Sequence, residues 1–95
     1  MEVTYSPNAH EDMQFWKGTN DNRTFNRIWK LIENIQEAPF TGIGKSEPLK
    51  YNFSGLWSRR INTEHRIIYE LPSTIIIHSL WEHNPEAYFR YPAFS

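Results

Sequence analysis

Three β-strands are predicted in residues 56–83, LWSRRINTEHRIIYELPSTIIIHSLWEH. The strands cover residues 56–61, 65–71 and 74–83. Asn62-Thr63 and Pro72-Ser73, which lie between them, are typical of turns. Strands joined by turns this short pair antiparallel, so this region predicts the larger part of an antiparallel sheet.

Two more strands are expected nearer the N-terminus. Val3-Thr4-Tyr5 is a short β-prone stretch, and apolar side chains alternate at residues 49–53 after Pro48. Thr41-Gly42-Ile43-Gly44 precedes this second strand and is interpreted as a flexible connector.

Two helices are predicted between these strands. Ser6-Pro7 combines a capping hydroxyl with a proline suited to a first helical turn, and Asp21 can cap a second helix that Pro39 ends. The second helix carries an apolar stripe at helical spacing, made of Phe25, Ile28, Trp29, Ile32 and Ile35.

The order of elements is β-α-α-β-β-β-β, which predicts an α+β fold with two N-terminal helices packed on a small, twisted, mainly antiparallel sheet. Ninety-five residues are expected to form one domain, 1–95, with a core supplied by 15 aromatic side chains. We find no apolar run longer than three residues and no pattern typical of a secretory signal. The absence of cysteine excludes a disulfide framework and a thiolate nucleophile, and fits a cytoplasmic location.

Positive charge is concentrated in the middle of a chain whose net charge is −1. Residues 43–70 hold five basic and three acidic side chains, whereas the segments before and after this region are each net negative. This distribution favours a local anionic partner, although a solvated charged face is the alternative. The basic side chains are Lys45, Lys50, Arg59, Arg60 and Arg66.

Arg60 and Arg66 flank a short turn, so they are expected on neighbouring strands where both guanidinium groups could hold one phosphate. The alternative is that strand arginines only pair with Glu64 and Glu70 on a solvent-exposed face. Glu47 lies in the same basic region and can accept a proton, and His83, at the end of the last predicted strand, can donate one. His78 and His83 belong to opposite strand faces, so no metal site is expected.

The segments GIGKSEPLK (residues 42–50) and SGLWSRRINTEHRIIY (residues 54–69) resemble the YoeB (Txe) family of the RelE/ParE-like toxin superfamily. The resemblance extends over nearly the whole chain. It implies a toxin of a type II toxin-antitoxin system, a ribosome-dependent endoribonuclease that cleaves mRNA in the A site without a metal or cofactor.

The resemblance also implies roles for individual residues. Glu47 would be the general base on the RNA 2′-hydroxyl, Arg66 would stabilise the charged phosphorane, and His83 would be the general acid. The phosphate-binding residues would be Lys45, Lys50, Arg59, Arg60 and Asn84. The implied partners are a YefM-like antitoxin, mRNA and the 70S ribosome, with a homodimer or a toxin-antitoxin hetero-oligomer as assembly.

The chain departs from the family pattern after His83. Family members usually end in a His-Tyr pair, whereas Asn84 follows here and residues 84–95 form an extension. The missing phenol could be replaced by Tyr88 or Tyr91. Alternatively, the protein is a catalytically weakened binding protein that acts mainly in an antitoxin complex repressing its own operon. A free RNA-binding domain is less favoured, because the aromatic spacing does not match a base-stacking motif.

Overall fold

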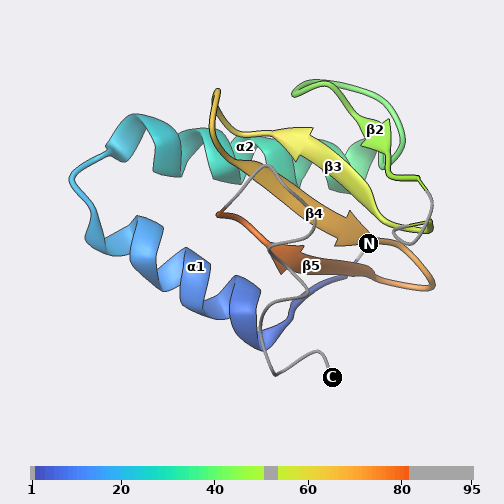
Figure 1. The fold of residues 1–95 in the computed structure, drawn as a ribbon, viewed down its shortest axis with the longest axis horizontal. Helices are drawn as coiled ribbons and strands as arrows, with labels where there is room; N and C mark the ends of the chain where they lie inside the picture. Colours follow the sequence, from blue (N-terminus) through green and yellow to red (C-terminus); the bar gives the residue numbers. More distant parts are fainter. Residues whose placement is uncertain (1, 51–53, 82–95) are drawn as a thin grey trace.

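The structure, a computed structural model, describes residues 2–50 and 54–81, which form two helices and a five-stranded sheet (Figure 1). The elements are β1 (Val3–Tyr5), α1 (Pro7–Gly18), α2 (Asn22–Glu37), β2 (Glu47–Pro48), β3 (Trp57–Arg60), β4 (Arg66–Glu70) and β5 (Ile75–Ser79). This order confirms the predicted β-α-α-β-β-β-β arrangement. No helix in the described part of the chain is long and apolar enough to cross a membrane.

The strand order in the sheet is β1-β5-β4-β3-β2. Strands β2 to β5 pair antiparallel with their neighbours, whereas β1 pairs parallel to β5, with Val3 opposite Ile75. The sheet is therefore mixed but mainly antiparallel, as expected.

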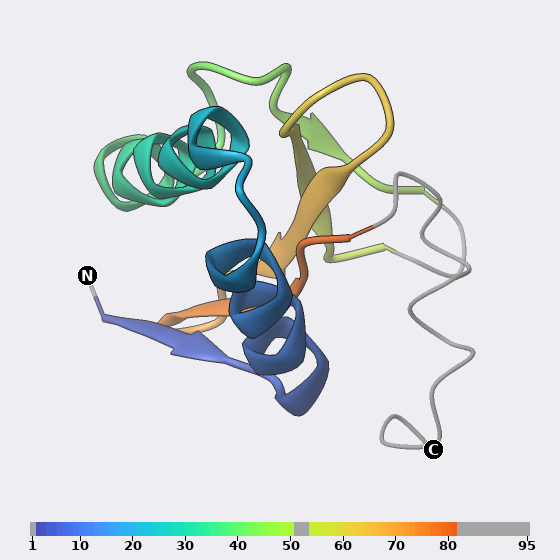
Figure 2. The same ribbon diagram turned by 90° about the vertical axis from the view of Figure 1, so that its left-hand side faces the viewer.

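Both helices lie on the same side of the sheet (Figure 2), where they enclose the core. Side chains alternate between the two faces of a strand, so every second residue of β4 and β5 points toward the helices. On this inner face Ile67, Tyr69, Ile75 and Ile77 are fully buried. The opposite, outer face carries polar side chains, such as Ser58 and Arg66, together with the apolar Ile68 and Ile76.

The predicted helix starts are confirmed by capping hydrogen bonds. The Ser6 hydroxyl accepts from the Ala9 backbone N–H at 3.1 Å, and the Asp21 carboxylate accepts from the Thr24 N–H at 3.0 Å. These caps satisfy amide groups that have no partner inside the helix.

The buried face of α2 differs from the predicted stripe at two positions. Trp29 is 42% exposed, whereas Leu31, which we did not include, is fully buried. A helix turns by about 100° per residue, which carries Trp29 away from the face that holds Ile28, Leu31 and Ile35. Trp29 instead packs edge-to-face on Phe25, with ring centroids 6.3 Å apart.

Two strand boundaries were wrong. Strand β2 lies at Glu47–Pro48, before the predicted start at Leu49, and residues 51–53 of the predicted strand lie outside the described residues. Strand β5 ends at Ser79, short of the predicted end at His83. Proline lacks a backbone N–H and is tolerated in an edge strand, which is the position of β2. The Leu49 N–H donates to the Leu56 carbonyl at 2.8 Å, which continues the pairing of the hairpin by one residue.

Candidate active site

The register of β2, β3 and β4 places four of the polar side chains on the outer face of the sheet. Glu47 lies opposite Ser58, and Arg60 lies opposite Arg66. Ser58 and Arg60 are two residues apart and so point to the same side of β3. The sheet therefore brings Glu47, Arg60 and Arg66 together, although they are up to 19 residues apart in the sequence.

Glu47 and Arg66 form the centre of this site. Nη1 of Arg66 lies 3.7 Å from Oε2 of Glu47 and donates to the Ser58 hydroxyl at 3.3 Å. The Glu47 side chain is 47% exposed and that of Arg66 22%, so the pair is open to solvent. An ion pair this exposed contributes little to stability and leaves both groups accessible to a ligand.

Arg60 adds a second cation beside Arg66. Like charges directly opposite each other on neighbouring strands are destabilising. An anion bound between the two guanidinium groups would remove this repulsion, and planar guanidinium groups suit the oxygens of a phosphate. The alternative, pairing of these arginines with Glu64 or Glu70, is not what the structure shows for Arg66, which pairs with Glu47. The Glu70 carboxylate instead lies 2.8 Å from His78 Nε2.

Lys45 and Lys50 flank β2 at exposed positions. Lys45 has a φ of 54°, a left-handed conformation that is uncommon for a residue with a side chain. Both lysines are a few residues from Glu47 in the chain, one before it and one after it.

The structure contradicts the expectation that Arg59 binds phosphate. Its side chain is fully buried on the inner face of the sheet, where alternation along β3 also places Trp57. The guanidinium group donates to the Tyr69 hydroxyl, to Asn34 Oδ1 and to the carbonyls of Ala38, Thr41 and Ile43.

These contacts make Arg59 the anchor of the loop between α2 and β2. Tyr69 supports the same loop, since its hydroxyl donates to the Pro39 carbonyl at 2.7 Å. The loop leads directly into β2 and hence to Glu47. Arg59 is therefore a positioning residue.

The loop is not the flexible connector that its two glycines suggested. Gly42 and Gly44 have φ values of 115° and 82°, which favour glycine. A Cβ atom on Gly42 would lie 2.1 Å from Asn34 Oδ1, and one on Gly44 would lie 2.7 Å from Leu31 Cδ2. The glycines are needed because the loop packs tightly against α2.

The remaining predicted site residues, His83 and Asn84, lie outside the described residues, as does the extension at 84–95. His65 contacts the Trp81 carbonyl, and His78 contacts Glu70. Within residues 2–50 and 54–81, no group of three or more His, Cys, Asp or Glu side chains could hold a metal ion. We did not predict Ser58 as a site residue, although it lies two residues before Arg60 and therefore on the same face of β3.

Comparison with known proteins identifies relatives over most of the chain. Residues 5–83 match the family model for the YoeB-like toxin of bacterial type II toxin-antitoxin systems. Toxin YoeB of Mycobacterium bovis is 52% identical over 67 residues, which cover 70% of this chain and 78% of that protein. Toxin YoeB of Escherichia coli K12 is 45% identical over 69 residues, with coverage of 73% and 81%.

Solved structures show the same fold. A YoeB/ParE toxin from Agrobacterium tumefaciens has a TM-score of 0.84 and 34% identity, and the match covers 88% of this chain and 100% of that one. A YoeB dimer and a YoeB–YefM complex from Staphylococcus aureus have TM-scores of 0.80 and 0.79 and identities of 38% and 37%, and each match covers 88% of this chain and 98% of the other. The family model and the sequence relatives agree with the fold, and the chain belongs to the YoeB-like toxin family of bacterial type II toxin-antitoxin systems.

Proposed function

We propose that this toxin is an endoribonuclease that cleaves mRNA in the A site of the ribosome and so stops translation. The observation that carries the proposal is the open Glu47–Arg66 pair, in which a carboxylate and a guanidinium group face solvent within 3.7 Å of each other. A carboxylate can take a proton from a hydroxyl, and a guanidinium group can stabilise charge that develops on a phosphate. These are two of the functions that assist phosphodiester cleavage by an internal hydroxyl.

In the proposed reaction the RNA supplies its own nucleophile. Glu47 removes the proton from a 2′-hydroxyl, whose oxygen attacks the adjacent phosphorus while the bond from phosphorus to the 5′-oxygen breaks. His83 donates a proton to that 5′-oxygen, which leaves a 2′,3′-cyclic phosphate and a 5′-hydroxyl end. Arg66 stabilises the charge on the non-bridging oxygens, and Lys45, Lys50, Arg60 and Asn84 hold the RNA. The reaction requires neither a metal nor a cofactor.

The proposed regulator is a YefM-like antitoxin. The Staphylococcus aureus relative forms a YoeB–YefM complex, and another structure of that relative is a YoeB dimer. We propose that this toxin likewise binds a YefM-like antitoxin, and that it forms either a homodimer or a toxin-antitoxin hetero-oligomer in the cytoplasm.

The test is mRNA cleavage during translation in a purified bacterial system, mapped by primer extension. The unaltered chain should give cleavage at the codon in the A site, and Glu47→Gln and Arg66→Ala should each reduce its rate by about 100-fold or more. Lys17→Gln, which removes an exposed cation at the end of α1, is the matched control and should cleave normally.

An unaltered chain that binds its antitoxin but cleaves no mRNA would contradict the proposal. That result would favour the alternative, a binding protein weakened by Asn84 that acts in an operon-repressing complex. Normal cleavage by folded Arg66→Ala would exclude the assigned role of Arg66.

A further inference from the structure

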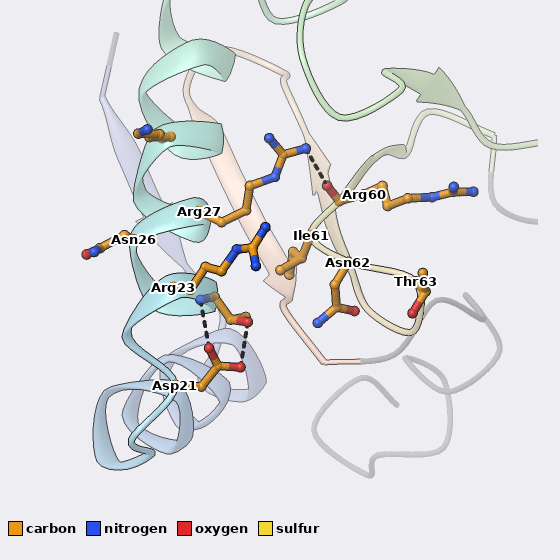
Figure 3. Close-up of a pocket in the computed structure, with 10 residues that line it drawn as sticks. Asp21, Arg23, Asn26, Arg27, Arg60, Ile61, Asn62 and Thr63 are labelled. Atoms are coloured by element: carbon orange, nitrogen blue, oxygen red, sulfur yellow. Dashed lines mark hydrogen bonds between the residues drawn. The ribbon is translucent and has the colours of Figure 1, made fainter.

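A groove separate from the Glu47–Arg66 site runs between α2 and the turn that joins β3 to β4 (Figure 3). It encloses about 970 Å³ and is lined mostly by charged and hydrogen-bonding side chains. The lining residues on α2 and its cap are Asp21, Arg23, Thr24, Asn26, Arg27 and Lys30. Those on the strand and turn are Arg60, Ile61, Asn62 and Thr63.

Three cations form a row along the α2 side of this groove. Arg23, Arg27 and Lys30 are spaced by four and three residues, which places them on one face of the helix. Figure 3 shows Arg23 and Arg27 directed into the space between α2 and the turn. Nη2 of Arg27 donates to the Arg60 carbonyl at 3.4 Å, which fixes that side chain across the groove.

This positive charge is offset only in part, by Asp21, whose carboxylate interacts electrostatically with Arg23. Among the described residues, none of the three cations lies within 4.0 Å of a carboxylate oxygen. Asp21 lies at one end of the row, but its carboxylate accepts from the Thr24 hydroxyl at 2.6 Å and from the Thr24 N–H at 3.0 Å. Like charges at this helical spacing repel each other, so an anionic ligand would stabilise the row.

We propose that this groove binds the phosphate backbone of a folded RNA, away from the nucleotides that are cut. The proposal rests on the function proposed above. Figure 3 shows that the Arg60 side chain points away from the groove, and its cross-strand neighbour is Arg66. The groove and the cleavage site therefore lie on different sides of the end of β3 and would hold different stretches of RNA.

The lining chemistry favours a sugar-phosphate backbone over other ligands. None of the lining residues is aromatic, so the groove offers no surface on which a base could stack. Only Ile61 is apolar, which leaves an acidic peptide without the apolar anchors that dominate most protein interfaces. The row is about 10 Å long at 1.5 Å per residue, which spans about three nucleotides of a helical strand.

The turn supplies a donor on the opposite side of the groove. Asn62 Oδ1 accepts from the backbone N–H groups of Glu64 and His65, both at 2.8 Å, which leaves the amide NH₂ as a donor. Figure 3 shows this nitrogen on the side toward α2. Phosphate contacts of this kind position RNA without reading its sequence.

The proposal is tested by the affinity of the full chain for a fluorescein-labelled RNA hairpin, measured by anisotropy between 50 and 200 mM salt. Arg23→Gln and Lys30→Gln should each weaken binding by roughly five- to eightfold at 0.1 M salt, because one phosphate contact contributes about 0.7–0.9 to the salt slope. The double variant should lose both contributions. Lys17→Gln is the matched control and should bind like the unaltered chain.

The results distinguish an RNA-binding groove from a solvated helix face and from a protein interface. Affinity and salt slope that do not change in the folded double variant would show a solvated helix face and overturn the proposal. The same is true if the double variant keeps its RNA affinity but binds the antitoxin more weakly, because the groove would then be a protein interface. The assay does not require cleavage, so a chain that binds the hairpin through the groove but cuts no mRNA would contradict only the function proposed above.

Discussion

Arg59 and Arg60 are adjacent in the chain but lie on opposite faces of β3, and this difference gives them different roles. Arg59 is fully buried and holds the loop before β2, whereas Arg60 is partly exposed beside Arg66. The buried guanidinium group is satisfied by hydroxyl, amide and carbonyl oxygens, including those of Tyr69 and Asn34. Buried polar groups are tolerated only when they are hydrogen-bonded in this way.

We predict that Arg59→Met destabilises the protein by about 3 kcal/mol, because it removes a buried guanidinium group that donates to three carbonyls of the loop. The change is to be measured by urea denaturation. Arg60→Met is the matched control and should change the free energy of unfolding by about 0.5 kcal/mol or less, since it removes a partly exposed charge. Equal destabilisation by the two substitutions would contradict the anchoring role of Arg59.

Residue type alone did not separate these two arginines, which both appeared as candidate phosphate ligands. The pairing of Arg60 with Arg66 was predicted correctly, because a short turn fixes which residues lie opposite each other. The burial of Arg59 depends on Asn34 and on three carbonyls of a distant loop. Such partners are brought together only by the folded chain.

At the level of elements, local capping rules predicted the helices well. Ser6, Asp21 and Pro39 are signals that act on the neighbouring backbone, so their effect is independent of the rest of the fold. Strand boundaries were predicted less well, because a strand ends where its partner ends. Strand β2 pairs with β3 over only two residues, and the apolar alternation after Pro48 gave no sign of this.

We predict that Asp21→Ala lowers the melting temperature at pH 7 and that Asp21→Asn lowers it less, because asparagine can also cap a helix. Hydrogen bonds from the Thr24 side chain and backbone hold the pKa of Asp21 below its usual value. The stabilisation is therefore fully present above the unfolded value near 3.9 and is lost as the pH falls through the lower, folded value. Thermal unfolding between pH 7 and pH 2 tests this. A difference between Asp21→Ala and the unaltered chain that grows toward low pH would contradict it.

Glycine is favoured in the loop between α2 and β2 for two reasons, a positive φ value and close packing against α2. Alanine substitutions can separate these two effects. Gly42→Ala should destabilise the protein more than Gly55→Ala, although both residues have positive φ values, of 115° and 95°. A Cβ atom on Gly55 meets open space, whereas one on Gly42 clashes with Asn34 Oδ1. Gly55→Ala therefore measures backbone strain of about 1–2 kcal/mol, and the excess for Gly42→Ala measures the clash. Equal losses in urea denaturation would show that the loop is loosely packed.

For the whole molecule, the division of the sheet into two faces separates stability from function. The inner face packs on both helices, and the outer face carries Glu47, Arg60 and Arg66. A partner can therefore cover the functional face without disturbing the core. The net charge of −1 conceals this arrangement, because the acidic side chains lie mainly elsewhere in the chain.

We predict that an acidic segment of the antitoxin covers the basic region of residues 45–66, so that toxin-antitoxin affinity falls as salt rises. Calorimetric titration of the toxin with its antitoxin at 50 to 300 mM salt measures this dependence. Arg60→Gln should reduce the salt dependence, whereas Lys17→Gln should leave it unchanged. An affinity independent of ionic strength would instead indicate inhibition by distortion of the site.

The parallel pairing of β1 with β5 also determines when, during synthesis, the sheet can form completely. Strand β1 can pair with β5 only after Ile75 has been synthesised. The sheet is therefore complete only when the ribosome has added 72 residues after Val3. At about 5–20 residues per second, this delay is about 4–14 s. A ribosome that makes this toxin is thus expected to finish nearly the whole chain before the chain is native.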